Sequence, residues 1–254
     1  MTEVILLFAL FLIEGVRART FTVYNACPFT VWPAVFTDPS KGSATPLVET
    51  GWEAQSNTSR TFYVPDNWAA GRIWGRRGCN FEAVQGPGSC LTGGCEGGLN
   101  CTQGGIPPCT LAEFTLSSTP DSSDYYDVSL RDGFDLPMRI SNNKGCPDAQ
   151  CAVDLNSICP DALKGTADPS GLTVACRTAC QANLDGNQAN STNCCSGAFS
   201  TPDTCPSNSV AFNDFFKGNC PDSFTFAFDE ASGTALKTCD GSNQADYTLT
   251  FCPP

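Results

Sequence analysis

Apolar and polar residues alternate along several short stretches of this chain. Phe21 and Val23 alternate with threonines, and Tyr126, Val128 and Leu130 share one side of another stretch. A two-residue repeat is typical of antiparallel strands that are buried on one face. The runs lie at 20–23, 60–64, 114–116, 126–130, 224–228 and 247–251. Two sheets packed face to face would bury these apolar sets, so we predict a mainly β fold, an antiparallel β-sandwich.

Two segments interrupt this pattern. Residues 77–110 are rich in glycine, proline and cysteine, and residues 153–220 contain two helix-like stretches, 172–183 and 208–217, among many cysteines. We interpret the first segment as a small disulfide-stapled loop domain and the second as a disulfide-rich domain of helices and loops. The remaining residues are expected to form the sandwich core: 19–76, 111–152 and 221–254.

The N-terminal end has the properties of a secretory signal. Residues 4–13 are almost all apolar, a run too short to span a bilayer, and small residues precede a cleavage point after Ala18. We predict a signal peptide over 1–18 and a secreted protein, extracellular or in the cell wall, without a stable membrane anchor. An uncleaved anchor is the alternative. Sequons at Asn57 and Asn190 agree with secretion and are candidate glycosylation sites.

The composition restricts the chemistry. The 254 residues include 17 cysteines and no histidine, and the formal net charge is −12. The cysteines predict structural disulfides. The sequence contains no Cys-x-x-Cys spacing, which argues against a metal site. Without histidine, acid–base chemistry depends mainly on carboxylates. The negative charge argues against nucleic acid and anionic membranes and suits neutral ligands such as sugars. We expect no cofactor and a monomer.

Several motifs together resemble the thaumatin family. Residues 86–95, with the sequence GPGSCLTGGC, and the following Cys101 are similar to the family signature, and 21–33 is similar to its first strands. Further similar stretches lie at 71–76, 110–114, 126–134, 220–222 and 251–253. The resemblance implies a thaumatin-like β-sandwich core with two smaller disulfide-rich domains. The acidic composition is closer to the acidic, secreted members, fungal ones among them, than to the basic sweet-tasting ones.

The resemblance also implies a disulfide framework, which spacing alone leaves open. The implied pairs are Cys27–Cys252, Cys79–Cys90, Cys95–Cys101, Cys146–Cys239, Cys151–Cys220, Cys159–Cys176, Cys180–Cys194 and Cys195–Cys205. Cys109 is left over. It is either a buried inert thiol or a surface thiol that dimerises or reacts.

Charged residues beside the strands admit two interpretations. Glu113 and Asp127 are out of phase with the neighbouring apolar residues, which by itself predicts solvated acids on the outer face of a sheet. The family resemblance instead implies an acidic cleft formed by an arginine, a glutamate and three aspartates. The matching residues here are Arg72, Glu113, Asp127, Asp132 and Asp222.

Two carboxyl groups across a scissile bond are what glycoside hydrolysis requires. Glu113 is the candidate general acid, Asp127 the candidate base or nucleophile with Asp132 second, and Arg72 and Asp222 would position substrate. Three aromatic residues are candidates for stacking on sugars: Tyr125, Phe134 and Phe215. The resemblance favours an endo-β-1,3-glucanase acting on cell-wall polysaccharide. The alternatives are a non-catalytic glucan-binding or membrane-perturbing antifungal protein and, with less support, an inhibitor of foreign hydrolases.

Overall fold

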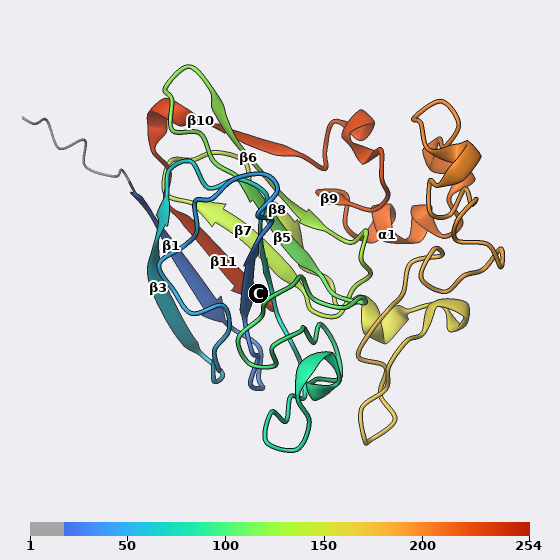
Figure 1. Ribbon diagram of the computed structural model, residues 1–254. Helices are drawn as coiled ribbons and strands as arrows, with labels where there is room; N and C mark the ends of the chain where they lie inside the picture. Colours follow the sequence, from blue (N-terminus) through green and yellow to red (C-terminus); the bar gives the residue numbers. More distant parts are fainter. Residues whose placement is uncertain (1–17) are drawn as a thin grey trace, which may run out of the picture.

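A computed structural model describes residues 18–254 and contains two packed β-sheets (Figure 1). The first sheet has the strand order β3 (Thr58–Pro65), β1 (Ala18–Asn25), β11 (Tyr247–Phe251), β7 (Met138–Asn142) and β8 (Ala149–Cys151). The second has the order β10 (Lys237–Asp240), β6 (Ser123–Ser129), β5 (Leu111–Thr115), β4 (Gly71–Trp74) and β2 (Ala34–Thr37), with β9 (Ser223–Phe224) also paired to β6. The predicted signal peptide falls almost entirely on residues outside this description, so it stays a prediction.

The alternating runs form strands, as predicted. In β1, buried residues alternate with partly exposed ones, which is what a strand covered on one face requires. Pairing is antiparallel except between β1 and β11 and between β6 and β9. The run at 224–228 is the exception, because β9 ends at Phe224. Phe226 lies beyond it, where it packs with Cys205 and Val210 outside the sandwich.

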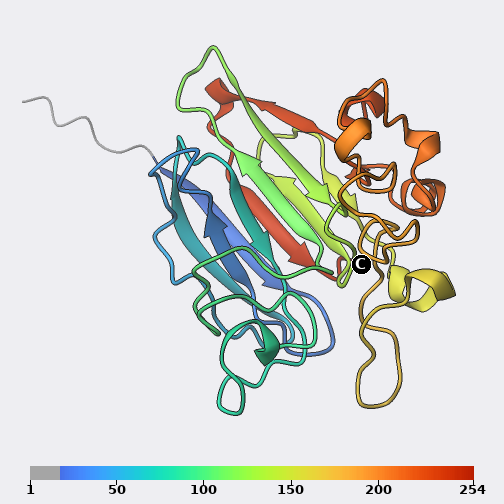
Figure 2. The same ribbon diagram turned by 45° about the vertical axis from the view of Figure 1, so that its right-hand side comes forward.

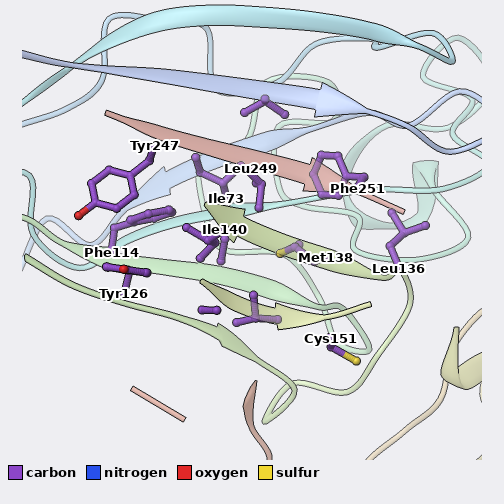
Figure 3. Packing of buried hydrophobic residues seen from close by; sticks show 14 of the residues in the cluster. Ile73, Phe114, Tyr126, Leu136, Met138, Ile140, Cys151, Tyr247, Leu249 and Phe251 are labelled. Carbon is purple, nitrogen blue, oxygen red and sulfur yellow. The ribbon is translucent and has the colours of Figure 1, made fainter. Parts of the chain in front are cut away.

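Aromatic side chains fill one end of the space between the sheets (Figure 3). The ring centroids of Phe21 and Phe114 are 5.0 Å apart, and those of Tyr126 and Tyr247 are 5.1 Å apart, in edge-to-face arrangements. Such pairs contribute about 0.5–1.5 kcal/mol beyond the burial of their area. These contacts join strands of both sheets and make the sandwich a rigid support for its outer faces.

The helix prediction is half right. α1 (Asn213–Asn219) overlaps the stretch predicted at 208–217, but the predicted helix at 172–183 is wrong. There Cys176 forms β-bridges to Phe134 and Lys164, which needs extended backbone, and turns follow. Short 3-10 helices occur at Gly86–Ser89, Leu155–Ile158, Asp161–Leu163, Gly197–Phe199, Ser207–Ser209, Asp229–Ser232 and Gly241–Asn243.

Eight disulfides join the same cysteines that the family resemblance implies. Two lie within 77–110 and three within 153–220, and the latter segment flanks the sheets (Figure 2). Cys109 is free and fully buried, so the interpretation as a surface thiol is wrong. The division into a core and two smaller domains stays a prediction.

Two further properties concern the helices and the sequons. Within residues 18–254, no helix is long and apolar enough to cross a bilayer. Asn57 and Asn190, the residues of the two sequons, are both exposed, so a glycan at either would not disturb the core.

Candidate functional site

Three of the predicted residues lie side by side on the outer face of the second sheet. Arg72 on β4 is directly opposite Glu113 on β5, and Glu113 is directly opposite Asp127 on β6. Side chains directly opposite each other on neighbouring strands point to the same face, with Cβ atoms about 4.5–5.5 Å apart. The strand register therefore produces a row of one cation and two carboxyl groups from residues far apart in the sequence.

Glu113 is held from two sides. Its Oε1 accepts a hydrogen bond from Nε of Arg72 at 2.9 Å, and its Oε2 accepts one from Nη2 of Arg131 at 3.0 Å. The Glu113 side chain is 18% exposed, and each arginine side chain is 39% exposed. Charge-assisted bonds of this kind fix a carboxylate in position while leaving part of it accessible.

Asp127 is in a different environment. It is only 8% exposed, and its Oδ1 is buried without a hydrogen-bond partner in the part of the chain that the structure describes. Burial raises the pKa of this carboxyl well above its usual range, and the neighbouring Glu113 raises it further, against the opposing effect of Arg131. The expectation of a solvated acid is therefore wrong for Asp127, because surrounding residues cover this part of the outer face.

The row opens into a pocket of about 250 Å³. Besides the three predicted residues it is lined by two further acids, Asp38 and Glu230, and by aromatic and apolar groups. Tyr125 is among these and is 44% exposed, so its ring is available for stacking. Phe134, by contrast, is fully buried in the core, which rules it out as a stacking surface. Phe215 packs partly buried against the same core.

Asp132 and Asp222 are placed differently from the row. Asp132 does not line this pocket but an adjoining one of about 230 Å³, which shares Arg131 with the first. Asp222 lines neither, and its Oδ1 accepts a hydrogen bond from Nζ of Lys237 at 2.8 Å. An ion pair with Lys237 compensates the charge of Asp222, and the residue is not part of the lining of either pocket.

Arg131 is the functional candidate that sequence reasoning missed. Its guanidinium bonds Glu113 and lies over the Phe224 ring, 5.6 Å from the centroid. Burial alone would lower the pKa of Arg131. The ion pair with Glu113 and the neighbouring carboxyl groups of Asp127 and Asp132 outweigh this effect and raise it. The available signal was its position two residues after the end of β6, the strand that carries Asp127, and directly before Asp132.

The residues of the pocket do not form a metal site. Within residues 18–254, no group of three or more His, Cys, Asp or Glu side chains is arranged to hold a metal ion. The charged groups available in the pocket are the ion-paired Glu113, the buried Asp127, the two further acids Asp38 and Glu230, and two guanidinium groups.

The chain matches the model of the thaumatin family over residues 25–253, and it belongs to that family. Pathogenesis-related protein 5 of Arabidopsis thaliana is 42% identical over 253 residues, which cover 98% of this chain and 97% of that protein. A relative from Prunus avium named glucan endo-1,3-beta-glucosidase is 37% identical over 244 residues, covering 94% of this chain and 92% of that protein.

Among solved structures, a GH family 64 laminaripentaose-producing β-1,3-glucanase from Paenibacillus barengoltzii has a similar fold. The TM-score is 0.55 at 13% sequence identity, and the match covers 94% of this chain and 75% of that one. At this level of identity the similarity concerns the fold alone.

Proposed function

We propose that this protein is a secreted defence or wall-remodelling protein that binds cell-wall β-1,3-glucan in the pocket around Glu113 and Asp127, and hydrolyses it. The row of Arg72, Glu113 and Asp127 is the observation that carries the proposal. It places a buried carboxyl with a raised pKa directly beside an ion-paired carboxylate, and such pairs of unlike carboxyl groups perform glycoside hydrolysis. The glucan endo-1,3-beta-glucosidase of Prunus avium supports the choice of substrate.

The geometry favours roles that differ from those expected from the sequence. Asp127, with its raised pKa, is the better general acid and would give its proton to the leaving glycosidic oxygen. Glu113 would then activate water or attack the anomeric carbon. Arg72 and Arg131 hold Glu113 in place, and Tyr125 offers an aromatic face to a sugar ring. The net reaction consumes one water for each glycosidic bond broken.

The proposal predicts the behaviour of two near-isosteric variants. Asp127→Asn cannot donate the proton, and Glu113→Gln cannot serve as base or nucleophile, so each should reduce release of reducing sugar from soluble β-1,3-glucan by roughly 10²–10⁴-fold. Glu49→Gln is the matched control, because Glu49 is exposed and pairs with Arg60 away from the pocket. Wild-type rates in both pocket variants would overturn the assignment.

Glucan binding without turnover is the second candidate function. Both oxygens of Glu113 already accept hydrogen bonds from arginines, so part of the accepting capacity of this carboxylate is used within the protein. This alternative is selected if the protein binds the glucan but the polymer keeps its length after prolonged incubation. The two candidates share the pocket and differ in whether the bound glucan is cleaved.

A further inference from the structure

A separate pocket of about 380 Å³ is lined by Arg77 and by residues of the segment 154–174. Its lining shares no residue with the pocket around Glu113 or with the adjoining one. The volume lies within the range of small-molecule binding sites. The lining combines cations, carboxylates, a buried amide and an apolar side chain: Arg77, Lys164, Asp154, Asp168, Asn156 and Leu172.

Asn156 brings a buried acceptor without a partner to this pocket. The residue is 5% exposed, and its Nδ2 donates a hydrogen bond to the backbone oxygen of Asp135 at 2.9 Å, which fixes the orientation of the amide. Among residues 18–254, its Oδ1 accepts no hydrogen bond. A buried acceptor that is left unpaired is costly, so a ligand with a hydroxyl donor would gain from satisfying it.

Arg77 is a half-buried cation that is held in place without an acidic partner. Its guanidinium lies over the Phe29 ring, 4.5 Å from the centroid, and its Nη1 donates to the backbone oxygen of Asp135 at 3.4 Å. In the part of the chain that the structure describes, Arg77 forms no ion pair, although the protein has 26 acidic residues against 14 basic ones. A guanidinium fixed in this way is prepared to bind a carboxylate through paired N–H donors.

The two aspartates of the lining are oriented by their own turns. Oδ1 of Asp154 accepts a hydrogen bond from the backbone N–H of Asn156 at 3.1 Å. Oδ1 of Asp168 accepts bonds from the backbone N–H groups of Ser170 and Leu172, at 2.8 and 3.0 Å. Oδ2 of each aspartate accepts no hydrogen bond within residues 18–254, so both carboxylates have accepting capacity for hydroxyl groups.

We propose that this pocket binds a uronate, the acidic sugar unit of a polysaccharide, whose carboxylate pairs with Arg77 and whose hydroxyl groups donate to Asn156 and the two aspartates. A neutral sugar would leave Arg77 unpaired, and an inorganic anion such as sulfate would bring no donor for Asn156. The acceptors come from two separate turns, which suits a ring with several hydroxyl groups better than a single ammonium group. The inference does not depend on the proposed function, because the site and the ligand are both different.

The test is calorimetry with digalacturonate, glucuronate and the methyl ester of digalacturonate, which keeps the hydroxyl groups but has no charge. The wild-type protein should bind the acids, and it should bind the ester about tenfold more weakly than digalacturonate, because a charge-assisted pair accounts for at least that factor. Arg77→Gln should lose about tenfold in affinity for digalacturonate and nothing for the ester. Ser157→Trp adds bulk at an exposed position of the lining and should weaken binding of both.

Arg60→Gln is the matched control. It causes the same change of charge, and Arg60 also lies over an aromatic ring, 5.1 Å from the centroid of Trp52, but does not line this pocket. It should keep the wild-type affinity for digalacturonate. The uronate site is refuted if the wild-type protein binds neither acid, if the ester binds as tightly as the acid, or if Arg77→Gln and Ser157→Trp both bind digalacturonate like the wild type. Hydrolysis of β-1,3-glucan tests the proposed function separately and should be unchanged in both variants.

Discussion

Asp127 and Glu113 show how neighbouring residues of the same chemical type acquire different properties. They face each other across β5 and β6, yet Glu113 is ion-paired with two arginines and Asp127 has a buried oxygen without a partner. Alternation in the sequence predicted their common face. It could not predict the burial of Asp127 or the contact between Arg131 and Glu113, because both depend on segments that the fold brings together.

The raised pKa of Asp127 predicts a pH-dependent stability. The folded chain retains a proton that the unfolded chain releases near the ordinary value of 3.8, so this group makes the fold less stable as the pH rises above that value. Asp127→Asn has no such loss. Its melting temperature should exceed that of the wild type at neutral pH, by about 2–4 °C for each ~1 kcal/mol gained in the free energy of unfolding. The difference should disappear below about pH 3.8.

Thermal unfolding of both proteins across this pH range measures the difference. A variant that is as stable as the wild type at every pH, or less stable than the wild type at neutral pH, would show that Asp127 is not a destabilising buried acid.

At the scale of elements, one buried ion pair links the two sheets. Arg19 on β1 donates to Asp124 on β6 at 2.9 Å, and the Tyr247 hydroxyl on β11 donates to the same carboxylate at 2.8 Å. The Arg19 and Asp124 side chains are 1% and 0% exposed. The alternating pattern predicted the strands that carry these residues but not this contact, because charged residues in strands are ordinarily assigned to the wet face.

Removing one partner of this pair should be costly. Asp124→Ala leaves the Arg19 guanidinium buried and unpaired, so the free energy of unfolding should fall by roughly 3–5 kcal/mol. Glu49→Ala is the comparison, since the Arg60–Glu49 pair is exposed and its loss should cost less than about 1 kcal/mol. Urea unfolding of both variants checks this, and equal losses would contradict the structural role given to the buried pair.

Predictions from local residue spacing also failed in two places where tertiary contacts determine the conformation. Cys176 and Cys180 have helical spacing, but their partners are Cys159 and Cys194, and the backbone at Cys176 pairs with Phe134. Phe226 continues an alternating pattern past the end of β9 and packs elsewhere. In both places the contacts that decide the conformation come from distant residues, which periodicity does not report.

At the scale of the whole molecule, the disulfides join segments that are distant in the sequence. Cys27–Cys252 spans 225 residues and joins the chain just after the neighbouring strands β1 and β11, and Cys151–Cys220 joins β8 to the end of α1. Spacing alone could not give these pairs, whereas the resemblance to the thaumatin family did. The same resemblance identified Arg72, Glu113 and Asp127, which the register then places in one row.

The disulfide pairing predicts that the number of thiols that react with a reagent changes when the protein unfolds. Cys109 is fully buried, and burial raises the pKa of its thiol, helped by nearby Asp135 and Asp132, so the native protein should not react with a thiol reagent. In denaturant without reductant, one thiol per chain should react. Three or more would show that one of the eight pairs is open, and a reactive thiol in the native protein would contradict the burial of Cys109.

The most direct test of the account is a carboxyl ¹³C NMR titration of the aspartates with and without laminarihexaose. Asp135 is an internal control, because burial raises its pKa to about 6 and it lines neither pocket. We predict that Asp127 titrates well above its ordinary value of 3.8, and that the ligand changes its signal while the Asp135 signal stays the same. An Asp127 that titrates near 3.8, or whose signal is unchanged by the ligand, would contradict the account.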